Sequence, residues 1–582
     1  MDNIPDSKKD ILELLNNNAN IEDKNDEGRT LLHRASADGY LDIVNILLDR
    51  NVNIEARDNT NYTPLTCASL NGHLEIVQVL LSKNANIEAV DNDGDTPLLG
   101  AIINNRINIV ITLLNNNANI EAKNEKGFTP LIMATIRTHR EIIYELLNRN
   151  ANINAMENLN FTSLSIASRD GDFDIVCELL NRNADIETKN KDGCTPLHNA
   201  ILAGHNNVAY ELLNRNTNIE AIDEDGNTPL HIATLIKNKD IVYELLSRNA
   251  NIEAMNKRGN TPLHIATLIN NKDIVCELLS RNANIEAMDK HGYTPFHVSV
   301  ISNATDIMFE LMNRNANIMT QNYNNLSPVF SAVLFDKNDI LCELLNRNVD
   351  IMTRGANNST LLYVASSLGH INITSELLKR GANIDAHCNE NFTPLHMASK
   401  NGHINVVSML LEHNANIEAK TKDLYTPLHI AIIENKYDVV LELLKRNADI
   451  EARGLENYTP LCIASLMGYK DIIVLLLSHN ANLRVVIGTH NYTPYDIAVK
   501  KNHSRDIILL LKINNIKDDI VKNDDIDYKK NLISRITCSI CFVNERNVVF
   551  NCGHSTCDDC SENIIKCCEC KVNITIRIPL LL

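Results

Sequence analysis

Residues 227–259 read NTPLHIATLIKNKDIVYELLSRNANIEAMNKRG, and residues 260–292 repeat that stretch almost unchanged. Up to residue 255 of the first copy, the two differ only at Lys237 against Asn270 and at Tyr243 against Cys276. Self-similarity at a period of 33 residues indicates a stack of similar units, because each unit buries its apolar face only against its neighbours. The stretch therefore predicts a repeat array rather than a single compact core.

The same phase runs along most of the chain, marked by a hydroxyl residue that opens each unit. Pro-Leu follows most of these residues, and a small residue, usually Ala, stands five positions later. A Thr or Ser N-cap accepts a hydrogen bond from a free backbone N–H, and Pro at the first helical position has no N–H to leave unpaired. Each hydroxyl residue therefore predicts the start of a first helix. These residues are Thr30, Thr63, Thr96, Thr129, Thr162, Thr195, Thr228, Thr261, Thr294, Ser327, Thr360, Thr393, Thr426, Thr459 and Thr493.

A second helix in each unit is predicted by segments such as residues 240–246, whose apolar residues recur at helical spacing. It is expected to end at a residue in the left-handed conformation, which favours Gly first and Asn next. That residue is Gly at 381 and Asn at 18, 51, 84, 117, 150, 183, 216, 249, 282, 315, 348, 414, 447, 480 and 514. Cys177, Cys276 and Cys342 share one position of this helix, where small buried side chains are a better interpretation than metal or redox sites.

The period and the Thr-Pro-Leu-His motif resemble the ankyrin repeat. The resemblance implies an all-α solenoid of about fifteen repeats over residues 1–516, each a helix-turn-helix with a β-hairpin tip. Residues 8–18 would supply an N-terminal half-repeat cap. The resemblance also implies protein binding along the hairpin tips and first helices, with no catalytic site. The Asn- and Ile-rich composition is similar to that of ankyrin proteins from large DNA viruses.

Aromatic residues concentrate at one position, directly before the hydroxyl residue of the repeat. In the ankyrin family this is an exposed contact position, and exposed aromatics often anchor interfaces. Packing of each ring across the neighbouring hairpin is an equal alternative. The residues predicted to bind a partner are Tyr62, Phe128, Phe161, Tyr293, Phe392, Tyr425, Tyr458 and Tyr492.

The C-terminal end of the sequence carries eight side chains that can bind a metal. Thiolate and imidazole are the ligands that zinc prefers, and four of them close a tetrahedral site, so eight make two sites. A segment this short usually depends on metals, disulfides or partners. A disulfide knot is the alternative, but paired Cys-x2-Cys spacings in a chain without a secretory leader favour zinc. The ligands are Cys538, Cys541, Cys552, His554, Cys557, Cys560, Cys567 and Cys570.

This order resembles the RING finger of ubiquitin ligases, above all those of the inhibitor-of-apoptosis and Mind bomb proteins, which share the entry from Val548 to His554. The resemblance implies a domain at 537–582 after a charged linker at 517–536. It implies two interleaved zinc ions, one held by Cys538, Cys541, Cys557 and Cys560 and the other by Cys552, His554, Cys567 and Cys570. The alternating tail, residues 572–578, implies a homodimer of fingers.

A RING finger supplies no nucleophile; it holds a ubiquitin-charged conjugating enzyme in the geometry that favours attack by a substrate lysine. By resemblance, Ile540 offers an apolar contact to that enzyme, Ile564 adds a second, and Lys571 aligns with a cation that bridges enzyme and ubiquitin. Two residues depart from the family pattern. Lys571 stands where Arg is usual, and Cys568 stands where Pro is common.

The amino-acid composition limits the classes of partner that the protein is expected to bind. The net charge of -18 argues against non-specific binding to nucleic acid or to anionic membranes. No apolar run approaches the roughly 18 residues that cross a bilayer. We therefore expect a cytoplasmic or nuclear protein, where thiols stay reduced. Two functions fit: a RING-type ubiquitin ligase whose array binds substrate, or a non-catalytic binding scaffold with a purely structural zinc module.

Overall fold

The computed structural model describes residues 8–16, 20–347, 349–487 and 491–522 of the 582-residue chain. These residues contain 31 α-helices and two short 3-10 helices, η1 (Ala356–Asn358) and η2 (Leu455–Asn457). Apart from α1 (Lys8–Asn16), the helices form fifteen consecutive pairs, which is the number of repeats that the sequence predicts. In this part of the chain, no helix combines the length and the hydropathy that a membrane span needs.

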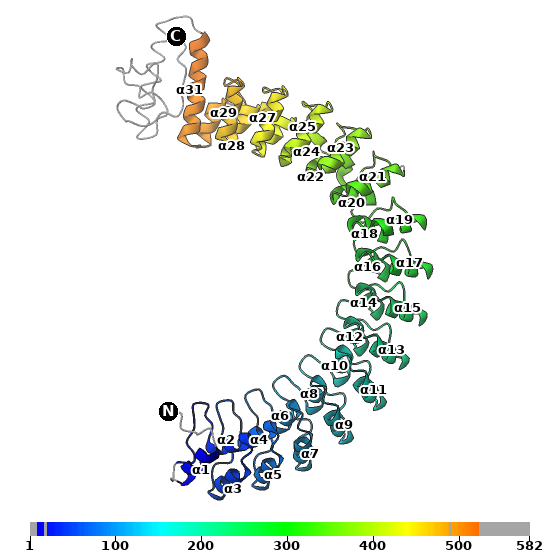
Figure 1. Cartoon of the computed structure of the whole chain (residues 1–582). Coiled ribbons are helices and arrows are strands. Elements are labelled where there is room, and N and C mark those ends of the chain that lie inside the picture. Colours follow the sequence, from blue (N-terminus) through cyan, green and yellow to red (C-terminus); the bar gives the residue numbers. More distant parts are fainter. Residues whose placement is uncertain (1–7, 17–19, 348, 488–490, 523–582) are drawn as a thin grey trace, which may run out of the picture. The chain divides into compact units, whose positions relative to one another are not determined.

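The chain divides into two compact units, and the first is Met1–Ile318. Within it the pairs stack in chain order, with the first helices along one side and the second helices along the other (Figure 1). The first helices are α2 (Leu31–Asp38), α4 (Pro64–Asn71), α6 (Pro97–Ile103), α8 (Pro130–Ile136), α10 (Ser163–Asp170), α12 (Pro196–Leu202), α14 (Pro229–Leu235), α16 (Pro262–Leu268) and α18 (Pro295–Ile301). The second helices are α3 (Leu41–Asp49), α5 (Leu74–Ser82), α7 (Ile107–Asn115), α9 (Arg140–Asn148), α11 (Phe173–Asn181), α13 (Asn206–Asn214), α15 (Lys239–Ser247), α17 (Lys272–Ser280) and α19 (Thr305–Asn313).

The second unit begins at Met319 and has the same internal arrangement. Its first helices are α20 (Pro328–Leu334), α22 (Leu361–Leu368), α24 (Pro394–Asn401), α26 (Pro427–Ile433), α28 (Pro460–Met467) and α30 (Pro494–Lys500). Its second helices are α21 (Asn338–Asn346), α23 (Ile371–Lys379), α25 (Ile404–Glu412), α27 (Tyr437–Lys445), α29 (Lys470–Ser478) and α31 (Arg505–Lys522).

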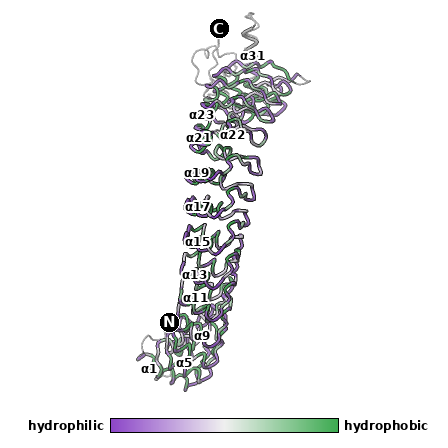
Figure 2. Tube along the Cα trace, turned by 90° about the vertical axis from the view of Figure 1, so that its right-hand side faces the viewer, coloured by the Kyte–Doolittle hydropathy of each residue, from purple (hydrophilic) through white to green (hydrophobic). Residues whose placement is uncertain are grey.

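The hydroxyl residues stand at the N-caps of the first helices as predicted, although the Ser327 side chain makes no cap hydrogen bond. Thr63, for example, is extended, and its side chain accepts a hydrogen bond from the Thr66 N–H, while Pro64 opens the helix. The small residue five positions later is fully buried at Ala68 and at its counterparts. Apolar and polar positions alternate along the chain with each repeat (Figure 2). Within each unit the core is therefore a layer between first and second helices rather than one central cluster.

Where the structure describes them, the left-handed Asn residues predicted before residue 514 follow the second helices, whereas Asn18 and Asn348 lie outside the described residues. Asn51, Asn84 and Asn249 have φ of 55°, 64° and 62°, and Gly381, which replaces Asn, has φ of 80°. The prediction is wrong at Asn514. There α31 continues to Lys522, past the expected end of the array at residue 516, and the Asn514 side-chain amide donates to the Leu510 carbonyl. The repeat motif of the sequence does not recur after Thr493, so no turn is required after one repeat length here.

Successive repeats are also joined outside the core, by a carboxylate in each Asn-Ile-Glu segment. The backbone N–H of Asn86 donates to Glu55 Oε1 at 2.7 Å, and that of Asn119 donates to Glu88 Oε1 at 2.7 Å. The same bond recurs along both units, for example from Asp449 to Glu418. Glu at this position therefore links its own repeat to the next one.

The expected β-hairpin tips form tight hairpin turns. In the described residues the strand-like pairings are two isolated bridges, Arg354 with Thr360 and Ile487 with Tyr492. At other tips two backbone bonds close the turn, as from the Asp58 N–H to the Tyr62 carbonyl at 3.1 Å and from the Asn61 N–H to the Asp58 carbonyl at 3.0 Å. Neighbouring tips are also bonded, as from the Asn59 N–H to the Glu27 carbonyl at 2.9 Å. The tips therefore form an ordered edge without extended strands.

Candidate protein-binding surfaces

In six repeats a buried histidine holds the hairpin tip of the next repeat against its own. Nδ1 of His396 accepts from the Thr393 N–H at 3.2 Å and lies 2.8 Å from the Thr393 hydroxyl. Its Nε2 lies 3.0 Å from the backbone carbonyl of Tyr425 in the next repeat. Because Nδ1 accepts and a carbonyl can only accept, Nε2 carries the proton and the ring is neutral. The recurring histidines are therefore structural.

Burial shifts the titration of these rings. Desolvation lowers the pKa of His396 and of His429 to about 4. It also lowers the pKa of His33, His198, His231 and His264. The network therefore favours neutral imidazole at neutral pH.

All eight aromatic residues predicted to bind a partner are half-buried. Phe128 and Phe161 pack together on a buried cluster that contains Ile132 and Ile166. Tyr458 and Tyr492 pack on a second cluster, which contains Ile487. These rings contribute to the stack, as the packing alternative expects.

Three other rings of the set rest on the histidine of their own repeat. Phe392 meets His396 edge-on, with ring centroids 5.7 Å apart, and Tyr293 meets His297 at 5.6 Å. Tyr425 lies 5.7 Å from His429 and covers Gly454, where an added Cβ would come within 2.6 Å of the Tyr425 ring. Each of the eight keeps some exposed area, so a role in binding stays a prediction beside the packing role.

Among the described residues, the most exposed aromatic side chains lie at other positions. Tyr323, at a hairpin tip, is 68 % exposed, Phe335 follows α20 at 43 %, and Tyr437 opens α27 at 41 %. Sequence reasoning missed them because it looked for aromatics at one recurring phase, and these occur singly. A search for aromatic residues that depart from the repeat pattern at a surface position could have found them.

Cys177, Cys276 and Cys342 are half-buried rather than fully buried. Burial raises the pKa of each thiol, and Glu211, Glu310 and Glu376 of the following repeats raise it further. A raised pKa keeps the thiol protonated and unreactive. Their partial exposure differs from the buried side chains that the sequence favours, while the raised pKa argues against a reactive thiol.

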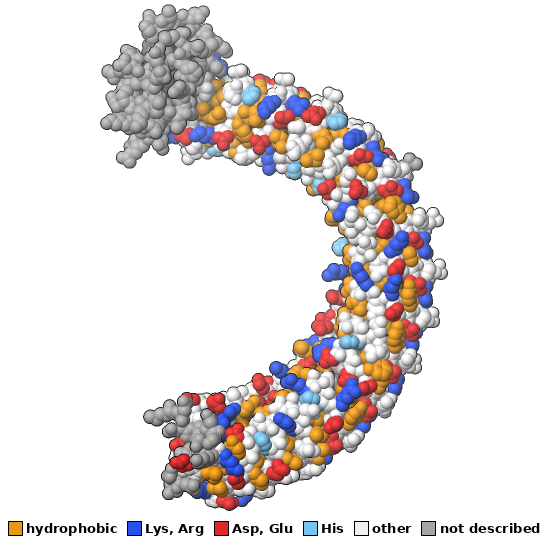
Figure 3. Space-filling model, viewed as in Figure 1, with side chains coloured by type: hydrophobic (Ala, Val, Ile, Leu, Met, Phe, Trp, Pro, Cys, Tyr) orange, Lys and Arg blue, Asp and Glu red, His pale blue; other side chains and the backbone are white. Residues whose placement is uncertain are grey.

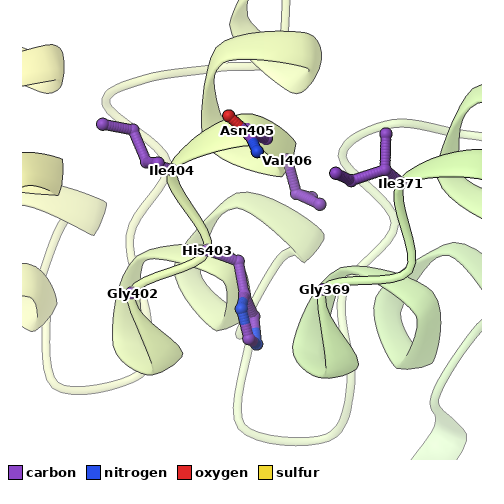
Figure 4. Close-up of a pocket in the computed structure, with 7 residues that line it drawn as sticks. All are labelled: Gly369, Ile371, Gly402, His403, Ile404, Asn405 and Val406. Atoms are coloured by element: carbon purple, nitrogen blue, oxygen red, sulfur yellow. The ribbon is translucent and has the colours of Figure 1, made fainter.

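A small groove lies between two repeats of the second unit, at the turns that join first and second helices (Figure 4). Its volume is about 220 Å³, and Ile371 and Val406 face each other across it. The His403 ring forms its floor, with Nε2 3.0 Å from the Ser367 carbonyl. Gly369 is needed beneath that ring, because its φ is +78° and a Cβ would come within 2.6 Å of His403 Nδ1.

The eight predicted zinc ligands and the three predicted contacts to a conjugating enzyme, Ile540, Ile564 and Lys571, lie outside the described residues. Within the described ranges, no group of three or more His, Cys, Asp or Glu side chains could hold a metal ion. On the face that Figure 3 shows, acidic and basic side chains are intermixed.

Comparison with known proteins assigns the repeats. A family model described as "Ankyrin repeats (3 copies)" matches residues 6–91, 84–157, 164–256, 236–322, 329–423 and 428–524. Over 44 residues the chain is 48% identical to the E3 ubiquitin-protein ligase RGLG4 of Arabidopsis thaliana. This match covers 8% of this chain and 11% of the relative. Over 43 residues it is 44% identical to the E3 ubiquitin-protein ligase RGLG5 of the same organism. This second match covers 7% of this chain and 10% of the relative. The chain thus spans about a tenth of the length of the curated relatives it matches.

Proposed function

Since the chain belongs to the ankyrin-repeat family, we propose that it is a RING-type E3 ubiquitin ligase whose repeats bind a protein substrate. In this proposal residues 537–582 recruit a ubiquitin-charged conjugating enzyme. Ankyrin repeats generally bind proteins, so the array supplies substrate selection. The single observation that carries the ligase half is the ordered set of eight Cys and His residues from Cys538 to Cys570.

The similarity to two ubiquitin ligases supports the same reading. Each match covers about as many residues as the segment 537–582 contains. Seven thiols and one imidazole are donors that suit zinc and suit hard cations poorly. Bound zinc would hold the finger folded and take no part in ubiquitin transfer.

In this mechanism the protein acts by positioning. The repeats hold the substrate, and Ile540 and Ile564 give the finger an apolar contact for the conjugating enzyme. Lys571 lies directly after the last ligand, where a cation would steady ubiquitin against that enzyme. Raising the local concentration of a substrate lysine near the thioester then accelerates transfer without a protein nucleophile.

The test is self-ubiquitination by the purified full-length chain with activating enzyme, ubiquitin and a panel of conjugating enzymes. Wild type should form ubiquitin chains with at least one of them. Ile540→Ala should lose that activity while keeping its zinc content, because the residue lies between ligands and does not coordinate. Losing about 1.5–3 kcal/mol of apolar contact weakens a micromolar encounter tenfold or more.

Two results would contradict the ligase proposal. One is an inert wild type with every conjugating enzyme, which would favour the binding scaffold with a structural zinc module. The other is an Ile540→Ala variant as active as wild type. Lys571→Ala serves as a graded control, since it should slow transfer while recruitment of the conjugating enzyme persists.

A further inference from the structure

We propose that the second unit contains a hinge, at the junction between the repeat of α20 and α21 and the repeat of α22 and α23. The two repeats are direct neighbours in the stack (Figure 1). A repeat buries its apolar surface only against its neighbours, so the local stability of an array depends on each interface in turn. The interface with the fewest bonds opens most often. Four kinds of link that join other repeats are changed at this one.

The first changed link is the carboxylate that joins one Asn-Ile-Glu segment to the next. Glu418 Oε1 accepts from the Asp449 N–H at 2.7 Å, and acidic side chains at 385 and 451 make the same bond. At the junction this position is held by Met319, one repeat before Asp350. A thioether is a much weaker hydrogen-bond acceptor than a carboxylate. The residue type therefore weakens this link.

The second changed link is the histidine that bonds to the tip of the next repeat. Phe330 holds its position in α20 and is buried. The Phe330 ring lies against Gly355 of the next tip, where an added Cβ would come within 3.0 Å of the ring. A phenyl ring cannot donate as an imidazole N–H does. The hydroxyl of Ser327, which meets the histidine in other repeats, is buried without a hydrogen-bond partner in the described structure.

The third changed link is the backbone bond between neighbouring tips. In the following junction the Asn389 N–H donates to the Asn357 carbonyl at 3.1 Å. At the proposed hinge the second tip adopts the 3-10 turn η1. Within the described residues, no corresponding backbone bond runs from Ala356 to Asn324. The two tips are therefore less firmly joined than their neighbours.

The fourth changed link comes from the residue that precedes the second helix. In the following junction His403 Nε2 lies 3.0 Å from the Ser367 carbonyl. His370 holds the same position at the proposed hinge, but its Nε2 is buried without a hydrogen-bond partner in the described structure. Its Nδ1 lies 3.7 Å from Asp336, which is too long for a good hydrogen bond. A buried polar atom without a partner destabilises the closed junction.

One polar link is kept, and it joins the two second helices. The Arg380 guanidinium at the end of α23 donates to Asn346 Oδ1 at the end of α21, at 2.9 Å. Elsewhere the junction is held by apolar packing of the helices. The kept bond therefore provides the pivot, and the repeats from α22 onward can change their angle to α20 and α21.

A second junction serves as a natural control, because it has the same kind of tip but keeps the side-chain links. The turn η2 precedes α28 as η1 precedes α22. There the bond between Glu418 and Asp449 is present, and His429 Nε2 lies 3.2 Å from the Tyr458 carbonyl. The 3-10 turn alone therefore does not make a hinge. The combined loss of links distinguishes the junction between α20 and α22.

The test is hydrogen exchange of the full-length chain, measured by mass spectrometry. Amides of α20 and α22 should exchange at least about tenfold faster than those of α26 and α28. Met319→Glu should slow exchange in α20 and α22 by roughly two- to tenfold, because one net hydrogen bond shifts an opening equilibrium by that factor. The new carboxylate would face Asp350 as Glu418 faces Asp449. Position 319 is 41 % exposed, so the variant leaves the core intact.

Two further variants control for the added charge and for the position. Met319→Lys is polar and of similar length, but a lysine accepts no hydrogen bond, so exchange should stay at the wild-type rate. Glu418→Met places the weak acceptor in the control junction. It should speed exchange in α26 and α28 by roughly two- to tenfold.

The proposal is overturned if α20 and α22 exchange no faster than α26 and α28. It is also overturned if fast exchange ends at α21 and leaves α22 protected, because the opening then lies elsewhere. A folded Met319→Glu variant with unchanged exchange, or Met319→Lys slowing it equally, would exclude the missing carboxylate as the cause. None of these measurements requires ubiquitin transfer, so the hinge and the ligase activity can fail independently.

Discussion

Nε2 of His396 donates a hydrogen bond to the backbone carbonyl of Tyr425 at 3.0 Å, and so ties one repeat to the hairpin of the next. On its other side, Nδ1 receives the N–H of Thr393, the cap of its own helix. One neutral ring thus satisfies a cap and an inter-repeat contact together. A proton on Nδ1 would place two donors face to face in a buried site.

The array should therefore lose stability in mild acid. The folded-state pKa of His396 and of His429 is about 4, below the ordinary value of 6.5, so between these pH values the unfolded chain binds protons that the folded chain does not. Stability then rises with pH over this window and falls as pH drops from 6.5 toward 4. Each of the two rings accounts for a loss on the order of 2–3 kcal/mol. Urea midpoints from pH 7.5 to 4 measure it.

One repeat supplies a control for the histidine. In α20 the position of the histidine is held by Phe330, which is 1% exposed, and the hydroxyl of the capping Ser327 is buried without a hydrogen-bond partner in the described structure. His396→Phe should copy that arrangement. We expect a lower stability at pH 7.5 and a shallower fall in acid. An unchanged pH dependence would show that other groups govern the acid transition.

The nearly identical repeats at residues 227–259 and 260–292 allow the cost of a left-handed backbone conformation to be compared for two residue types. Lys237 and Asn270 occupy the same turn, with φ of 62° and 54°. A lysine in the left-handed region costs more than an asparagine, whose side chain tolerates it. Lys237→Gly should raise the unfolding free energy by about 1 kcal/mol, and Asn270→Gly should raise it by clearly less. Equal gains in thermal denaturation would contradict this account.

Much of the fold could be predicted from the 33-residue period of the sequence. The caps at Thr63 and its counterparts, the left-handed Asn51 and Asn84, and the fifteen helix pairs were all predictable, because each repeats one local physical requirement many times. The extended α31 and the exposed Tyr323 were not predictable, because a single departure from a pattern carries no repeated signal. Whether an aromatic ring at a fixed phase packs or protrudes depends on its neighbours in space, as at Tyr425 above Gly454.

The aromatic positions can be tested for packing against binding. Tyr458 is half-buried on the cluster that contains Cys462 and Ile487, whereas Tyr323 is 68 % exposed. Tyr458→Ser should lower the unfolding free energy by about 1–3 kcal/mol, and Tyr323→Ser should leave it within about 0.5 kcal/mol. If Tyr458→Ser is as stable as wild type, its ring is held for a partner rather than for the stack.

The last prediction concerns the metal content of the C-terminal segment. Eight ligands in the order of a RING finger predict two zinc ions per chain, and Cys568, between Cys567 and Cys570, is expected to be a spectator. Mass spectrometry of the intact native chain should therefore find two zinc ions in wild type and in Cys568→Ser. Cys567→Ser should lose one ion, because a tetrahedral site with three thiolate or imidazole ligands is far weaker than one with four. Chelation should abolish any ubiquitin transfer and leave the helical signal of the array intact, since zinc-dependent folding is confined to the short segment. A single zinc in wild type, or loss of zinc in Cys568→Ser, would show that the ligand assignment is wrong.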